Sequence, residues 1–367
     1  MKHILLALAL SAVLFACESG QDENAPSDEV QNVNQQANKE PENSSLEMLE
    51  WEMMQSPTKS HIRGLCAVND SVVWISGTGG VVYRTSDAGE YWDNLTLPEC
   101  EDLDFRDIHA FDEEKALVVS AGYGVVIYGT MDGGIVWNEL YRDNDSTAFF
   151  DGFDFWNSQG GLAYGDPQNG KMALKRMKYG WKWQEANQNL PDALEGEAGF
   201  AASGTGIVIQ DNHVWIATGG GEVARVLHSA DSGMTWQAHN TPLVSGEGMG
   251  IFSIAFKNQD IGVAVGGSYI DSTNTNGNSA YSWDGGVTWN VPEAVPRGYR
   301  SCAAFSPDGS LCVAVGRTGC DYSTDEGYSW TGWSDEGFWV CDFGGEYLWA
   351  SGRSGKLGRV LISQLDN

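Results

Sequence analysis

An eight-residue motif that occurs five times, with a sixth eroded copy, sets the strongest constraint on the fold of this chain. Each full copy reads Ser or Thr, any residue, Asp, any residue, Gly, any two residues and Trp, as in residues 85–92. The motif Asp residues are Asp87, Asp132, Asp231, Asp284 and Asp325. Successive motif Trp residues, with Trp183 of the eroded copy included, lie 41 to 53 residues apart. A repeat of this length built from short strands predicts an all-β fold, the β-propeller.

A second signal sets the number of blades. Short apolar strands that end in Gly occur seven times, at residues 73–77, 118–122, 162–165, 215–219, 263–266, 313–316 and 349–352. They predict seven blades of four strands each. The alternative is six or eight blades, which holds if the long fourth unit has been divided at the wrong place. The seventh unit has no Asp motif, whereas residues 49–54 look like a fourth strand without its hairpin. We therefore expect the ring to be closed by this N-terminal strand, added to the last blade, because closure removes an unpaired sheet edge.

Residues 1–16 have the pattern of a lipoprotein signal peptide, with a basic start and an apolar run over residues 4–15. The sequence Leu-Phe-Ala-Cys at residues 14–17 predicts cleavage before Cys17 and lipidation of its sulfur. An ordinary secretory signal is the alternative. Both interpretations predict an exported protein in the periplasm or at the cell surface, and the first adds a lipid anchor as the sole attachment to a membrane.

The rest of the chain divides into a tether and one domain. Residues 17–47 are polar and contain no aromatic side chain, so they cannot bury enough apolar surface to fold and are expected to be a disordered tether. Residues 48–363 form the predicted propeller domain. The six Cys residues of this domain show no C-x-x-C spacing, and we expect most of them to be buried free thiols.

Composition and motif searches exclude several functions. The net charge of −29 argues against a nucleic-acid partner, because such a chain cannot neutralise a run of phosphates. Residues 165–172 imitate a phosphate-binding loop, but Met172 stands where a hydroxyl is needed and strands flank the segment. No spacing of ligands predicts a metal site, and nothing predicts a cofactor. The motif Asp residues are interpreted as structural acceptors for backbone N–H groups of their own turns.

Arginine residues mark the candidate site. Alignment of the blades places Arg63, Arg106 and Arg300 at the start of the innermost strand, with Asp151 and Glu197 near that position in blades three and four. After the Gly of the second strand, blades six, seven and three carry Arg317, Arg353 and Asp166 respectively. Both positions approach one end of a propeller channel, so the pattern predicts a patch that binds anions or carboxylates. The alternative is that each Arg pairs with a neighbouring acid and holds a blade junction.

The chain resembles a known family on finer patterns. These patterns are Asp166-Pro167, residues 197–205, residues 215–220 and residues 298–302. The Asp motifs are similar to bacterial-neuraminidase-type repeats, and the finer pattern resembles bacterial envelope propellers similar to the photosystem II stability and assembly factors. This resemblance implies a non-enzymatic platform that binds an envelope protein. It also implies that Arg63, Arg106 and Arg300 are the counterparts of an arginine patch that contacts the client.

A sialidase-like or other glycoside hydrolase is the alternative function. Sialidases use three Arg residues, a Tyr nucleophile assisted by Glu, and an Asp acid, and a glycan ligand therefore stays possible. The Arg-Ile-Pro pattern of sialidases is absent, since Gly64, Asp107 and Ser301 follow the three Arg residues. Tyr299 or Tyr269 with Glu197 is the remaining candidate pair. We assign no catalytic residue from the sequence.

Overall fold

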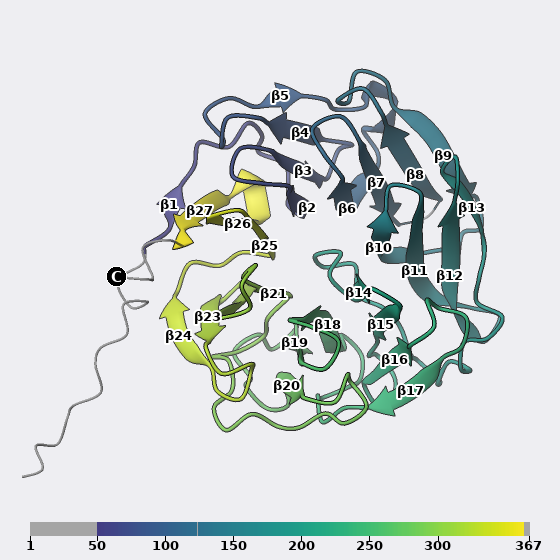
Figure 1. The fold of residues 1–367 in the computed structure, drawn as a ribbon, viewed down its shortest axis with the longest axis vertical. Coiled ribbons are helices and arrows are strands. Elements are labelled where there is room, and N and C mark those ends of the chain that lie inside the picture. Colours follow the sequence, from purple (N-terminus) through teal and green to yellow (C-terminus); the bar gives the residue numbers. More distant parts are fainter. Residues whose placement is uncertain (1–49, 123, 363–367) are drawn as a thin grey trace, which may run out of the picture. The chain divides into compact units, whose positions relative to one another are not determined.

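The computed structural model describes residues 50–122 and 124–362, which form seven antiparallel sheets around a common centre (Figure 1). This confirms the predicted seven-bladed β-propeller. The predicted signal peptide (1–16), Cys17 and the tether (17–47) lie outside the described residues. No helix in the described part of the chain is long and apolar enough to cross a bilayer.

The first four blades follow one another along the chain. Blade 1 contains β2 (Ile62–Ala67), β3 (Val73–Gly77), β4 (Val82–Thr85) and β5 (Asp93–Asn94). Blade 2 contains β6 (Asp104–Ala110), β7 (Ala116–Ala121), β8 (Val125–Thr130) and β9 (Asn138–Asp143). Blade 3 contains β10 (Phe150–Asn157), β11 (Gly160–Gln168), β12 (Lys171–Lys178) and β13 (Lys182–Glu185). Blade 4 contains β14 (Ile207–Gln210), β15 (His213–Ala217), β16 (Arg225–Ser229) and β17 (Gln237–Asn240).

The last three blades complete the ring. Blade 5 contains β18 (Met249–Phe256), β19 (Gly262–Ser268) and β20 (Ser279–Ser282). Blade 6 contains β21 (Cys302–Phe305), β22 (Cys312–Gly316), β23 (Gly319–Ser323) and β24 (Thr331–Ser334). Blade 7 contains β25 (Val340–Gly344), β26 (Tyr347–Ser351), β27 (Leu357–Leu361) and β1 (Glu52–Met53). Two short 3₁₀ turns, η2 (Pro98–Cys100) and η3 (Arg353–Gly355), lie between strands.

Burial decreases from the middle of each blade outward. The second strands β3, β7, β19 and β22 are buried along their whole length, because neighbouring blades cover both faces of the sheet. Their Val, Ile and Ala residues suit a strand that is covered on both sides. The outer strands β9 and β17 contain mostly polar, solvent-facing residues. The first strands line the centre of the ring in Figure 1 and therefore position any site on the axis.

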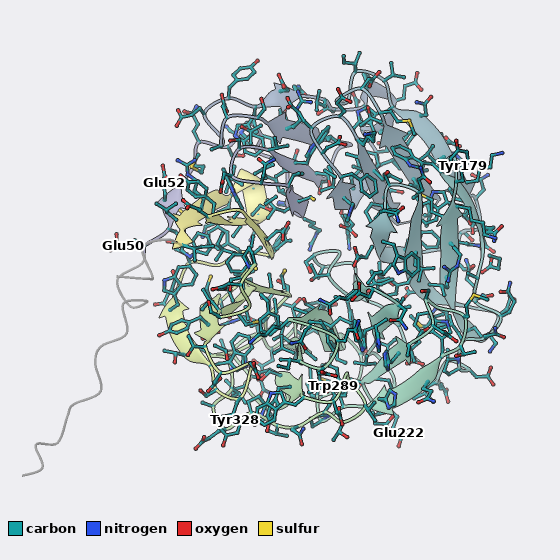
Figure 2. All side chains as sticks on the ribbon, viewed as in Figure 1. Glu50, Glu52, Tyr179, Glu222, Trp289 and Tyr328 are labelled. Carbon is teal, nitrogen blue, oxygen red and sulfur yellow. The ribbon has the colours of Figure 1, made fainter. Side chains whose placement is uncertain are left out.

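The N-terminal strand closes the ring as predicted. Strand β1 pairs antiparallel with β27, with Glu52 opposite Arg359, and Glu52 lies at the outer edge of the ring in Figure 2. The ring of Trp51 stacks on that of Trp333 at a centroid distance of 4.9 Å and contacts Phe338 at 4.6 Å. This strand gives the edge of β27 a hydrogen-bonding partner, which an open sheet would lack.

Blade 5 departs from the expected four strands. Its fourth strand is reduced to one pair of backbone hydrogen bonds between Tyr281 and Asn290. The following segment contains Pro292 and Pro296, which have no N–H to donate to a ladder. The segment instead bonds to the hairpin of blade 6, where Trp330 N donates to the Ala294 carbonyl at 3.0 Å.

All five Asp motifs form the same turn. In the first copy, Asp87 Oδ1 accepts hydrogen bonds from Tyr91 N at 2.9 Å and from the Thr85 hydroxyl at 2.8 Å. The Thr85 hydroxyl in turn accepts from Gly89 N at 2.8 Å. Asp132, Asp231, Asp284 and Asp325 repeat these contacts with the equivalent residues. The motif therefore satisfies the backbone groups of a hairpin with its own side chains.

Hydrogen bonds between the first strands join each blade to the next. At six of the seven junctions among the described residues, a side chain in the first strand of one blade accepts a hydrogen bond. The donor is a backbone N–H in the first strand of the next blade. The acceptors are Cys66, Asp107, Asp154, Ser253, Cys302 and Asp342. At the junction of blades 4 and 5, the Thr205 carbonyl accepts from Ile254 N at 3.0 Å. We call this set the inner relay.

The inner relay makes stability depend on pH. Asp107 Oδ2 accepts from Phe153 N at 2.9 Å, and burial raises the pKa of its carboxyl to about 8. Because folding raises this pKa, the contribution of Asp107 to stability is complete below the pKa of the unfolded state, about 4. It is lost as the pH rises through 8. We expect the melting temperature of Asp107→Asn to fall less than that of wild type between about pH 6 and pH 9. The control is Asp192→Asn, which changes an exposed carboxylate. If the melting temperature depended on pH equally in wild type and both variants, this account would be contradicted.

Candidate functional site

Bulges in the first strands bring single side chains to one end of the ring. The pairing of β2 with β3 shifts between Ile62 and Gly64, which leaves Arg63 as the extra residue. The same shift leaves Arg106 extra in β6 and Phe252 extra in β18. A bulge bends the strand and redirects the side chain of the unpaired residue. The sequence thereby places one side chain of each bulged blade at the same end of the ring.

These residues line a pocket of about 770 Å³ at the centre of the ring. Five of its lining side chains carry a positive charge, namely Arg63, Arg106, Arg317, Arg353 and Lys356. The other lining residues are His61, Phe200, Ala201, Ala202, Phe252, Tyr269, Tyr299, Ser301, Gly337 and Trp339. The structure thus brings four of the five sequence-predicted Arg residues together in one pocket.

Arg63 is held by neutral groups. Its guanidinium lies over the ring of Trp339, with Cζ 4.0 Å from the ring centroid, and Nη1 donates to the Ala202 carbonyl at 3.4 Å. Burial lowers the pKa of Arg63 from its usual value, and the positive charge of Arg106 lowers it further. Stacking on an aromatic face supports an arginine without neutralising it. The positive charge of Arg63 therefore remains available to a ligand.

The other cations differ in how they are paired. Arg106 forms an ion pair with Asp104 of the same strand at 2.8 Å. Lys356 pairs with Glu336, and Arg317 donates to the Tyr269 carbonyl. In the described part of the chain, no carboxylate lies within ion-pair distance of Arg63, Arg317 or Arg353. The pocket thus holds an excess of positive charge in a chain that is strongly acidic.

A segment between blades 3 and 4 forms the floor of the pocket. Residues 198–205, which we call the plug, cross toward the first strands of distant blades, and Figure 1 shows a loop before β14 that reaches the centre of the ring. The carbonyls of Ala201 and Ala202 accept from Arg106 and Arg63, and the Ser203 hydroxyl donates to the Ser301 carbonyl at 2.7 Å. The plug thus contacts blades 1, 2, 5 and 6. Its residues Phe200, Ala201 and Ala202 form part of the pocket lining.

Aromatic side chains form a second part of the pocket lining. Phe200 of the plug stacks on Phe252 at a centroid distance of 3.9 Å, and Tyr299 meets Phe252 edge to face at 4.7 Å. Tyr269 contacts the other edge of Phe252 at 6.3 Å. The pocket therefore offers both cations and an apolar surface, which suits an occupant with both negative charge and apolar side chains.

Arg300 does not belong to this pocket, and its assignment from the sequence is wrong. Its side chain is completely buried and pairs with Asp321, which is also buried. Arg300 Nη1 donates to Thr318 Oγ1 at 3.1 Å. Ser301 lines the pocket instead, so the blade alignment was displaced by one residue. A displacement of one residue in a strand moves a side chain to the opposite face.

The acidic candidates also lie outside the pocket lining. Glu197 is buried and accepts from Arg225 Nε at 2.9 Å and from the Thr218 hydroxyl at 2.7 Å. Asp166 Oδ1 accepts from Gly199 N at 3.0 Å, which fastens the start of the plug. Burial, and then the charge of Asp166, raise the pKa of the Asp151 carboxyl well above its usual value. None of these three acids is among the residues that line the pocket.

The lining does not contain the groups that glycoside hydrolysis uses. Among the described residues that line the pocket there is no carboxylate, whereas glycosidases use a pair of carboxyl groups or a tyrosine assisted by one. The proposed pairing of Tyr299 or Tyr269 with Glu197 is not formed. The Glu197 carboxylate instead accepts hydrogen bonds from Arg225 and Thr218. No cluster of three metal-ligating side chains occurs in the ranges that the structure describes.

Sequence reasoning missed the plug, Trp339 and the aromatic wall. Residues 197–205 were part of the family resemblance, but they lack the alternation that marks a strand, so their path could not be inferred. Trp339 stands just before β25 at the place that Arg63 and Arg106 hold in their blades. The usable signal was this position at the start of the first strand of the seventh blade, which the alignment of arginine and acidic residues left unassigned.

Two solved structures are similar to this fold. The structure titled YCF48 bound to D1 peptide has a TM-score of 0.61 and 17% identity, and the match covers 85% of this chain and 96% of that chain. The structure of YCF48 from Cyanidioschyzon merolae has a TM-score of 0.62 and 17% identity, with 85% and 99% covered. No protein-family model matches the chain, and no curated protein matches it. The likeness to these propellers shows the fold, as the sequence resemblance predicted.

The burial of Arg300 generates a stability prediction. Arg300→Ala leaves the buried Asp321 carboxylate with Arg297 as its remaining ion-pair partner, so we expect a loss of about 2 kcal/mol or more in the free energy of unfolding. Arg63→Ala removes a cation–π contact and one long hydrogen bond, and we expect a loss of about 1 kcal/mol or less. Urea denaturation of both variants measures the difference. Equal losses would show that both side chains occupy similar environments.

Proposed function

We propose that this protein is an exported, lipid-anchored platform of the cell envelope that binds another protein at the pocket and performs no catalysis. The single observation that carries the proposal is the convergence of Arg63, Arg106, Arg317 and Arg353 on one pocket. Three of them have no ion-pair partner among the described residues. Arginine presents a planar fork that matches carboxylates, and its charge is retained at every physiological pH.

The proposed partner is an exposed protein segment that carries carboxylates beside apolar side chains. The cations would bind the carboxylates, and Phe200, Phe252 and Tyr269 would contact the apolar groups. A similar propeller is titled as bound to a peptide, which supports protein binding as the kind of activity. The lack of a lining carboxylate favours binding over the glycoside hydrolase alternative.

Export and anchoring are supported by the sequence alone. The signal pattern over residues 1–16 and the residue Cys17 support a lipidated mature N-terminus. We include in the proposal that the Asp motifs are repeats of the bacterial-neuraminidase type and that the domain is tethered by residues 17–47. A lipid anchor would hold the domain near a membrane and raise its effective concentration there.

Site-specific photocrosslinking in the native cell tests this function. A photoreactive amino acid at Tyr269, which lines the pocket, is expected to capture one envelope protein. The same probe at Tyr179, an exposed position on blade 3, is the positional control. We expect Arg63→Ala with Arg317→Ala to abolish the Tyr269 crosslink, because half of the arginine charge is removed.

A charge-matched variant completes the test. Arg142→Ala with Lys182→Ala removes two cations from exposed positions on β9 and β13 and should leave the crosslink intact. The proposal fails if the crosslink persists in the pocket variant or disappears in both. Turnover of aryl glycosides by the purified domain would instead favour the hydrolase.

A further inference from the structure

An exposed aromatic cluster lies between blades 5 and 6. Trp283 is 51% exposed, and Tyr328 is 38% exposed. All fifteen Trp residues of the chain lie in the described ranges, and Trp283 is the most exposed of them. Figure 2 shows Tyr328 at the outer edge of the ring. The cluster is therefore separate from the axial pocket.

The rings form a shallow platform. The centroids of Trp283 and Tyr328 are 6.2 Å apart, with an angle of 30° between the rings. Tyr281 supports both, at 4.8 Å from Trp283 and 5.8 Å from Tyr328, and is itself 9% exposed. Two neighbouring rings with a small angle between them present a nearly continuous apolar surface to solvent.

The propeller scaffold does not require these side chains. At the position of Trp283, three other Asp motifs carry Ser86, Ala230 and Thr324 and form the same turn. At the position of Tyr328, the first motif carries Glu90. An exposed tryptophan gains little for folding, and exposed apolar patches mark binding sites. The contacts of the cluster thus point to a ligand.

Polar groups surround the platform. Glu293 N donates to the Tyr328 carbonyl at 2.8 Å, and the Tyr328 hydroxyl hydrogen-bonds to the Glu293 side chain. Asp284 and Asn290 are exposed on the neighbouring hairpin. The carboxylate and amide oxygens of these side chains accept hydrogen bonds from hydroxyl groups. The negative charge of the carboxylates repels phosphates and other carboxylates. The charge disfavours nucleic acids, anionic lipids and acidic peptides as occupants.

We propose that Trp283, Tyr328 and Tyr281 form a binding subsite for a neutral glycan, with a pyranose ring stacked on the indole. The axial C–H groups of a pyranose form a flat apolar face that matches an aromatic ring, and its equatorial hydroxyl groups reach acceptors such as Glu293. The subsite lies at the opposite end of the strands from the pocket, because the hairpin follows the third strand, whereas Arg63, Arg106 and Phe252 lie near the start of the first. It is therefore independent of the proposed protein-binding function.

The exposure of a single indole makes the test simple. Mild N-bromosuccinimide treatment of the full chain should oxidise Trp283 first, which peptide mass spectrometry identifies. We expect cellohexaose, chitohexaose or maltohexaose at millimolar concentration to protect this residue. Isothermal titration calorimetry should show binding of the same sugar, weakened about tenfold or more in Trp283→Ala and in Tyr328→Ala.

The controls separate stacking from general effects. Tyr179→Ala removes an exposed aromatic side chain from another hairpin and should bind the sugar as wild type does. Circular dichroism checks that each variant is folded, and protection of wild-type Trp283 is read without any variant. Failure of all three sugars, or equal binding in Trp283→Ala, would overturn the proposal. Protection by hexalysine but by no sugar would overturn it as well, since it would identify a cation site.

Discussion

The hydrogen bonds between successive first strands are the interaction on which the rest of this structure depends. Each blade alone is a small sheet with two uncovered faces, and its second strand is apolar on both. Burial of those faces requires every blade to have a neighbour on each side. The inner relay satisfies a backbone N–H at each junction with an acceptor from the preceding blade, so that the first strands approach closely without leaving these N–H groups unpaired.

The pocket follows from this closure. The relay fixes the first strands, and their bulges then direct Arg63, Arg106 and Phe252 toward one end of the ring. The plug bonds to blades 1, 2, 5 and 6 and contributes Phe200, Ala201 and Ala202 to the pocket lining. Its carbonyl groups also face the arginine side chains, which reduces the cost of gathering several like charges. The result is a concave cationic surface on an acidic protein, with its geometry set before any ligand binds.

Repetition made most of the fold predictable. The Asp motifs and the strands that end in Gly gave the blade count, and the missing hairpin of the last unit led to the closing strand at Glu52 and Met53. The repeat predicted a full fourth strand in blade 5, where the structure has a single pair of backbone hydrogen bonds. Pro292 and Pro296 have no N–H to donate to a strand pair, and the repeat pattern does not register them. Arg300 was assigned wrongly because a bulge adds one residue to some blades and not to others, and an alignment of strands does not reveal which. The plug has no periodic pattern, since its path is set by contacts with residues about a hundred positions away, such as Ser203 with Ser301.

The central claim is that the arginine side chains at the mouth of the ring form one anion-binding surface. An anomalous difference map from a crystal soaked in bromide tests it most directly, because bromide reports where the protein concentrates positive charge. The account predicts bromide inside the pocket, beside Arg317 and Arg353, and its loss in Arg63→Ala with Arg317→Ala. Bromide confined to the outer surface of the blades, with none in the pocket, would contradict the account.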